Sequence, residues 1–332
     1  MARSWGVAAV VLSGCSIENT ILPGHATDVF YQEVVDQVDI LFVVDNSASM
    51  AEEQEALASG FGSFIGELET ANSNFHVGVV STSQDTTDPE RGQLLGDPPY
   101  LTAEVPDYVT EFQDRVSMGV GGSDKEKGLE AAAVAVSPEL AIGYNQGFLR
   151  ADANLLIVMV SDEEDCSDDG RLDGQDASSC YAERGALVPV SHMVARIADA
   201  KANGELVQIA SIVGPYDSSC PDAYPGTRYV EAALQTGGLL GRICDQDWSN
   251  VLYDVGLNAV GILDRFKLTN AADMASLVVT VDGQPVPNSE VDGWTYDWQY
   301  WLILFHGAAV PARGSEIVVE YDIAPSAGAP LE

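Results

Sequence analysis

Two stretches of almost uninterrupted apolar residues constrain the fold of this chain more than any other feature. They are VDILFVV over residues 38–44 and NLLIVMVS over residues 154–161. A strand that is covered on both faces carries a continuous apolar run, whereas a strand with one face in water alternates. Helical patterns follow both runs, over about 51–70 and 181–202. We therefore predict interior strands of a parallel sheet with helices on both faces.

Residues 36–265 continue this alternation and are predicted to form one domain, after a short tether over 15–35. Strands that alternate with helices indicate an α/β fold, here a Rossmann-like, doubly wound and mostly parallel sheet. Ligands of such sheets bind beyond the carboxyl ends of the strands. The remaining elements are expected as strands over 75–81 and 206–213, helices over 126–136, 227–234 and 248–257, and a long loop over 82–110.

Residues 266–324 carry strand patterns alone and predict a small C-terminal antiparallel β module, followed by a tail over 325–332. Asp282 and Gly283 lie between alternating apolar positions, which is a strong hairpin signal. We therefore expect a β-hairpin near the start of this module.

Aromatic residues alternate in the same module at Trp294, Tyr296, Trp298 and Tyr300. On one unbroken strand they would share a face and offer a surface for carbohydrate. A turn near 297–300 is equally compatible with the sequence and would split them. We favour packing in the core of the module.

The N-terminus contains an apolar run over residues 5–12 that is well below the roughly 20 residues of a membrane span. The sequence LSGC at residues 12–15 resembles a bacterial lipobox. The resemblance implies that residues 1–14 are a signal peptide and that Cys15 is lipidated. Ser16 in place of Asp implies delivery to the outer membrane, on its periplasmic or its exposed side. The alternatives are an ordinary signal peptide or a start-site artefact with an incidental cysteine.

The charge of the chain limits its partners. It has 51 acidic and 15 basic residues, for a net charge of −36. Nucleic-acid binding needs many lysines and arginines to neutralise phosphates, so this class of function is excluded. Strong negative charge favours solubility and the binding of cations, and salt screens its self-repulsion.

Four cysteines remain beyond Cys15, and an even number in an exported chain indicates two disulfides. Three pairings are possible, and the local one would close two loops. Zinc is disfavoured because no CxxC pair is present and the histidines lack ligand spacing. The four residues are Cys166, Cys180, Cys220 and Cys244.

Oxygen-bearing side chains gather where the two apolar runs end. Asp45, Ser47 and Ser49 follow the first run at alternate positions, and Asp162 follows the second. Parallel topology brings both ends to one edge of the sheet. By themselves the first three could merely cap the next helix. Together with Asp162, and with Ser123 ahead of the helix over 126–136, they suit Mg²⁺, which prefers about six oxygen ligands and keeps several waters.

These residues resemble the metal-ion-dependent adhesion site of von Willebrand factor type A (vWA) domains, over roughly residues 38–264. Asp45, Ser47 and Ser49 match the DxSxS motif, and Asp162 matches the later Asp. Ser123 stands where that family has Thr, with Asp124 as a fallback ligand. The resemblance implies Mg²⁺, or Mn²⁺ or Ca²⁺, and a protein partner that offers a carboxylate to the ion. The whole chain is similar to vWA-bearing surface lipoproteins of Gram-negative bacteria.

A second acidic segment, SDEEDCSDDGRLDGQDASSC, covers residues 161–180. Its clustered carboxylates suggest a structural Ca²⁺, although the EF-hand spacing is missing. The alternative is a solvated loop closed by a disulfide. A rim this acidic would also repel an acidic ligand unless salt screens it. The candidate ligands are Glu164, Asp165, Asp168 and Asp169.

Signatures of enzymes are missing from the sequence. It contains no GxSxG, P-loop or HExxH motif. A serine nucleophile needs a nearby histidine base, and His76 is the one candidate in the first strands. We therefore predict a non-enzymatic envelope protein without a small-molecule substrate, which contacts the membrane through its lipid anchor only. The alternative is a Ca²⁺-stabilised structural or assembly component that binds no ligand through a metal.

Overall fold

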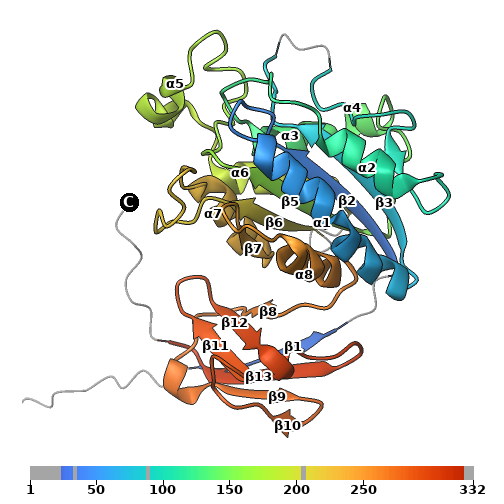
Figure 1. Cartoon of the computed structure of the whole chain (residues 1–332). Helices are drawn as coiled ribbons and strands as arrows, with labels where there is room; N and C mark the ends of the chain where they lie inside the picture. The colour runs from blue at the N-terminus through green and yellow to red at the C-terminus, as the bar shows by residue number, and fades with distance from the viewer. Residues whose placement is uncertain (1–23, 33–35, 87–89, 203–206, 325–332) are drawn as a thin grey trace, which may run out of the picture.

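The computed structural model describes residues 24–32, 36–86, 90–202 and 207–324 (Figure 1). The predicted signal peptide, the lipidation site at Cys15 and the tail over 325–332 lie outside these residues. Within these ranges, no helix combines the length and the apolarity needed to cross a bilayer.

A six-stranded sheet forms the centre of the larger domain and confirms the predicted fold class. Its middle strands are buried on both faces, as their apolar sequences require. Neighbouring strands are parallel except at one edge, where β4 runs antiparallel to β3. The order is β4 (Tyr100–Leu101), β3 (Asn74–Ser81), β2 (Gln37–Val44), β5 (Asn154–Ser161), β6 (Val207–Val213) and β7 (Leu240–Arg242).

Helices cover both faces of this sheet (Figure 1). On one face, Phe42 of β2 makes edge-on ring contacts with Phe64 and Phe112. That face carries α1 (Ala51–Thr70), α2 (Tyr108–Val116) and α8 (Ser249–Ala259), and the other carries α3 (Gly128–Ala135), α6 (Val190–Ala198) and α7 (Thr227–Thr236). Shorter helices are α4 (Pro138–Ala141), α5 (Ser178–Ala182) and the 3₁₀ turns Arg184–Ala186, Met274–Ser276 and Gly307–Ala309.

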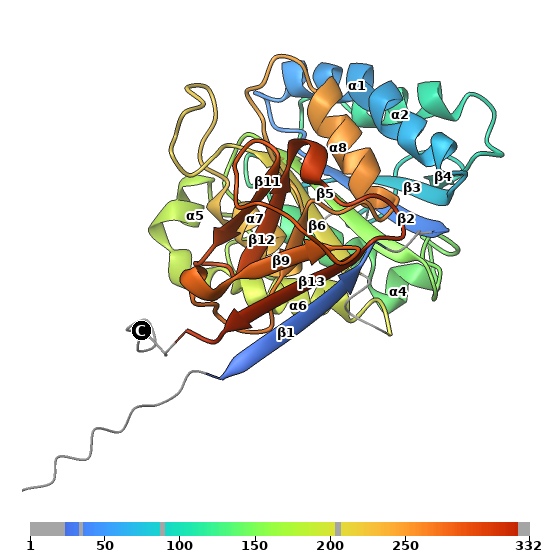
Figure 2. The ribbon, with the colours of Figure 1, turned by 90° about the horizontal axis from the view of Figure 1, so that it is seen from below.

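Two small antiparallel sheets form the predicted β module and pack around a core of their own (Figure 2). One sheet has the order β1, β13, β9, β10, and the other has the order β11, β12, β8. The strands are β1 (His25–Tyr31), β8 (Arg265–Lys267), β9 (Val278–Val281), β10 (Gln284–Pro285), β11 (Gly293–Asp297), β12 (Leu302–His306) and β13 (Glu316–Asp322).

The predicted tether over 15–35 is wrong where the structure describes it, because His25–Tyr31 forms β1. This strand pairs antiparallel with β13 along its whole length. Its alternation is weak in sequence, since Asp28 is one of its inward-facing residues. Asp28 is nevertheless buried, and it accepts hydrogen bonds from the hydroxyls of Thr269 and Tyr321 at 2.8 Å each. Because the buried position 28 is occupied by a polar residue, the sequence pattern did not indicate a strand here.

The hairpin and the aromatic residues of the module follow the sequence expectations. Asp282 and Gly283 both have positive φ, at 50° and 74°, and they join β9 to β10. Trp294 is buried in the module, whereas Trp298 is 76% exposed beyond the end of β11. A turn therefore splits the aromatic series, and the preferred core role holds for its first members.

The predicted long loop over 82–110 is only partly a loop, because it contains β4 and the start of α2. Tyr108, Phe112 and Val116 of α2 follow helical spacing, so the sequence did carry a signal for this helix. The helix predicted over 181–202 is likewise shorter and covers Val190–Ala198, after the separate turn α5.

Candidate functional site

The carboxylate of Asp45 is fixed at the end of β2 and fully buried. Its backbone N–H donates to Val160 O at 2.9 Å, so Asp45 still belongs to the sheet. Its Oδ1 accepts from the backbone N–H of Ser47 at 2.7 Å, and its Oδ2 accepts from Ser161 Oγ at 2.6 Å. Burial raises the pKa of Asp45 to about 6, against the lowering effect of these hydrogen bonds.

The hydroxyls of Ser47 and Ser49 lie beside each other, with 3.3 Å between their oxygens. They do not cap α1: its N-cap residue is Met50, which makes no side-chain capping bond. The interpretation of Asp45, Ser47 and Ser49 as a simple helix cap therefore does not hold. The two hydroxyl groups instead lie together at the sheet edge.

Asp162 reaches the same edge from β5, which is the parallel neighbour of β2. Its side chain is 4% exposed, and its Oδ1 is buried without a hydrogen-bond partner in the described ranges. Burial raises the pKa of Asp162, although a hydrogen bond with Ser49 lowers it. The topology thus brings Asp162 to the first motif, as predicted.

Ser123 lies near this cluster, but its polar groups have other partners. Its backbone N–H donates to Ser83 Oγ at 3.0 Å, and its own Oγ accepts from the backbone N–H of Lys125 at 3.1 Å. The loop is held to the first motif by a bond of 2.8 Å from Gly122 N to Asn46 O. Ser123 is half-buried, and the fallback residue Asp124 is exposed.

Two further carboxylates belong to the site and were missed in the sequence. Glu126 is 1% exposed, and burial raises its pKa to about 9, followed by the negative charges of Asp45 and Glu163. Burial likewise raises the pKa of Glu163 to about 7, followed by the charges of Asp162 and Asp45. Burial is the main cause of both shifts, and the neighbouring acids add to it.

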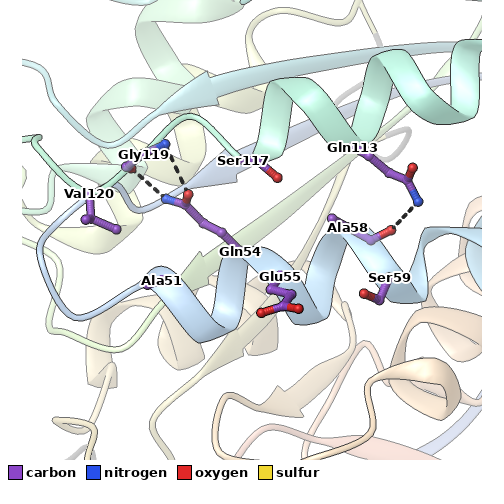
Figure 3. Close-up of a pocket in the computed structure, with 9 residues that line it drawn as sticks. All are labelled: Ala51, Gln54, Glu55, Ala58, Ser59, Gln113, Ser117, Gly119 and Val120. Carbon is purple, nitrogen blue, oxygen red and sulfur yellow. Dashed lines mark hydrogen bonds between the residues drawn. The ribbon is translucent and has the colours of Figure 1, made fainter.

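Gln54 of α1 is hydrogen-bonded to the loop that precedes Ser123. Its Nε2 donates to Asp45 O and to Gly119 O, at 3.0 Å each. Its Oε1 accepts from Gly119 N at 3.3 Å, so side chain and loop exchange two hydrogen bonds (Figure 3). A shallow pocket of about 470 Å³ lies along this contact, lined by Ala51, Gln54, Glu55, Ala58, Ser59, Gln113, Ser117, Gly119 and Val120.

The acidic segment is largely neutralised by basic residues from elsewhere in the chain. Asp168 pairs with Lys127 at 2.8 Å, Asp169 with Arg196 at 2.7 Å, and Asp165 with Arg228 at 2.9 Å.

Glu164 of the same segment accepts from the backbone N–H of Arg228 at 2.9 Å and from the hydroxyl of Thr227. The four residues proposed for a second cation are thus each occupied with protein donors, and they do not converge. Within the segment itself Arg171 is the one basic residue, so the sequence did not reveal the pairing partners elsewhere in the chain.

Two disulfides form with the local pairing, Cys166–Cys180 and Cys220–Cys244. The second closes a loop that touches the site, because Tyr224 N donates to Asp162 O at 2.8 Å. Disulfides of this kind are typical of proteins in an oxidising compartment.

His76, the candidate base of a serine nucleophile, lies at the other end of the sheet. It is in register with Asp39 near the start of β2, and its Nδ1 hydrogen-bonds to Phe148 O at 2.8 Å. Ser47 follows the opposite end of the same strand.

The residues at the site fit a divalent cation. Buried oxygens of Asp162 and Glu126 lack partners among the described residues, and the acids around them have raised pKa values. Over the same part of the chain, no three His, Cys, Asp or Glu side chains form a metal-binding group by themselves. The candidate site differs from such a group because serine hydroxyls, from Ser47, Ser49 and Ser123, make up three of its five predicted oxygen-bearing side chains.

Comparisons with known proteins give weak structural likeness only. No protein-family model and no curated protein matches the sequence. The chain is similar to the pilus adhesin SpaC from Lactobacillus rhamnosus GG in an open conformation, with 16% identity and a TM-score of 0.39, over 94% of this chain and 43% of that one. It is also similar to proximal thread matrix protein 1 from the mussel byssus, with 14% identity and a TM-score of 0.39, over 72% and 51%. The chain thus spans about half the length of each.

Proposed function

We propose that this chain is an exported envelope protein that binds a divalent cation at Asp45, Ser47, Ser49 and Asp162 and, through it, a macromolecular partner. The observation that carries the proposal is the buried, unpartnered Oδ1 of Asp162 beside the Asp45 motif. An ionised carboxylate in the interior is costly unless it is paired or coordinates a metal. A bound cation would remove this cost at the edge where α/β sheets bind ligands.

Mg²⁺, with Mn²⁺ and Ca²⁺ as alternatives, matches this set of donors because hard cations prefer oxygen. Ser47 and Ser49 would contribute hydroxyls, and Asp45 and Asp162 would contribute charge. The resemblance to vWA domains supports a protein partner that offers a carboxylate to the ion. Ser123 belongs to the set implied by that resemblance.

The proposed location is the outer membrane, with an acyl chain on Cys15 as the membrane contact. The lipobox-like LSGC sequence supports it, and the two disulfides agree with an oxidising compartment. Labelling with a radioactive fatty acid in a bacterial host tests this part separately. Loss of label in Cys15→Ser supports the anchor, and equal labelling contradicts it.

Calorimetric titration with Mg²⁺, Mn²⁺ and Ca²⁺ tests the cation. The wild type is expected to bind at least one of these ions, and Asp45→Ala is expected to bind none. Equal binding by the two proteins would contradict the site. A pull-down from envelope extract with and without EDTA then tests the partner, which should be retained only when the cation is present.

A further inference from the structure

Glu126 is, like Asp45, a buried acidic side chain at the site that no cation among the described residues compensates. It lies two residues before the start of α3, and its position in sequence is that of an ordinary helix-start residue. Instead its side chain is 1% exposed, and its Oε1 is buried with no hydrogen-bond partner in the described part of the chain. An unpaired buried carboxylate of this kind needs an explanation.

The two flanking lysines are directed elsewhere. Lys127 Nζ lies 2.8 Å from carboxylate oxygens of both Asp168 and Asp173. Lys125 Nζ donates to Leu172 O at 2.9 Å. Both lysines therefore contact the acidic segment over residues 161–180, and neither pairs with Glu126.

The backbone beside Glu126 is hydrogen-bonded to segments that follow strands of the central sheet. Cys166 N, which follows β5, donates to Glu126 O at 2.6 Å. The next residue, Lys127, donates through its N–H to Thr82 O at 3.1 Å, and Thr82 N donates to Val44 O at 3.2 Å. The backbone beside Glu126 is thus tied to the segments that follow β3 and β5, at the sheet edge where Asp45 and Asp162 also lie.

We propose that Glu126 is a third carboxylate of the divalent-cation site and takes the place in the second loop that the vWA resemblance gives to Ser123. It acts through a metal-bound water, because the carboxylates at the site do not group closely enough to be common direct ligands. Cations such as Mg²⁺ usually keep several waters, and carboxylates that accept from them orient and retain the ion. This inference rests on the proposed cation site.

Calorimetric titration of the purified protein with MgCl₂, MnCl₂ and CaCl₂ tests the assignment. Glu126→Gln is expected to weaken binding about 10- to 100-fold, as losses of such indirect ligands do. Glu139→Gln is the matched control, since it makes the same substitution at an exposed residue of α4, outside the candidate site. It is expected to bind like the wild type.

Melting temperatures in EDTA show whether the variants fold. Glu126→Gln should melt close to the wild-type temperature, because an amide of the same size can replace the buried carboxyl group when no cation is bound. If it fails to fold, Glu126→Met repeats the titration with a neutral side chain of similar length. A lower melting temperature for both variants would overturn the proposal, since it would show that the carboxyl group of Glu126 stabilises the cation-free fold.

The remaining outcomes separate this proposal from the proposed function. If the wild type and Glu126→Gln bind equally while Asp45→Ala does not bind, the cation site stands and the role of Glu126 is refuted. If Ser123→Ala loses more affinity than Glu126→Gln, the second loop acts through Ser123 and the proposal is again overturned. If the wild type binds no cation, both fail together.

Discussion

Ser161 Oγ donates a hydrogen bond of 2.6 Å to Asp45 Oδ2, and this contact joins the last residue of β5 to the residue that follows β2. The acceptor is fully buried, so the bond is shielded from water. It orients the first carboxylate of the site before any ligand arrives. The opposite oxygen of the same carboxylate is held by Ser47 N.

Removing this contact should destabilise the protein. Ser161→Ala leaves a buried carboxylate with one partner fewer, and hydrogen bonds to charged groups contribute about 1.5–3 kcal/mol. We expect a loss of that size in the free energy of unfolding, measured with urea in EDTA. Ser81→Ala, at the corresponding end of β3, is the control and should have a smaller effect. An unchanged Ser161→Ala midpoint would contradict the role of the bond.

Stability without divalent cations should fall as pH rises. The folded-state pKa values of Asp45, Glu163 and Glu126 are about 6, 7 and 9, all above their ordinary values. The folded state therefore holds protons that the unfolded state releases, and raising the pH from about 4 to 9 removes this stabilisation. Melting temperatures in EDTA should fall across this range, and a saturating cation should reduce the fall. A melting temperature that rises steadily with pH would contradict this prediction.

Lys127 should be one of the most sensitive positions outside the site. It is fully buried and pairs with the buried carboxylate of Asp168. Lys127→Met leaves that charge unpaired, which costs about 3–5 kcal/mol. Arg171→Met removes an exposed cation from the same segment and should change stability by less than about 0.5 kcal/mol. Urea unfolding of both variants provides the comparison, and similar midpoints would contradict the prediction.

A chelator should act through the Asp45 site alone. Because Lys127, Arg196 and Arg228 already pair with the acidic segment, we expect no second cation there. EDTA should lower the melting temperature of the wild type and leave that of Asp45→Asn unchanged. A large loss that persists in Asp45→Asn would instead favour the Ca²⁺-stabilised structural component.

Substitution of two tryptophans should distinguish a core position of the β module from a surface position. Trp294 is 4% exposed, and Trp294→Ala should cost about 3–5 kcal/mol in unfolding free energy. Trp298 lies mostly in solvent, and Trp298→Ala should change stability by no more than about 0.5 kcal/mol. Thermal unfolding of the two variants is the measurement. Equal losses would show that Trp298 is packed against the module.

Much of the α/β domain was predictable because its determinants are local. The apolar run that forms β5 has the same bounds in the sequence and in the structure, and α1 begins and ends where its pattern does. The nearness of Asp45 and Asp162 followed from topology, since both come directly after neighbouring parallel strands.

Glu126 and β1 could not be predicted, because distant residues determine their surroundings. Backbone hydrogen bonds tie Glu126 to Cys166 and its neighbour Lys127 to Thr82, whereas its position in the sequence is that of a helix-start residue. β1 is short and partly polar, and its partner strand lies almost 300 residues later, with His25 opposite Asp322. In both cases the sequence pattern is ordinary and the partner is remote.

The pairing of β1 with β13 has a mechanical consequence. β1 leads toward the α/β domain at its Tyr31 end, while His25 lies at the opposite end beside Asp322. Tension applied between the N-terminal side of His25 and the α/β domain therefore runs along the strand axis. Because β1 continues covalently into that domain, the backbone of β1 itself carries this tension. The hydrogen bonds of the β1–β13 ladder lie beside the path of the force, and the β module can stay paired while the N-terminal side is pulled.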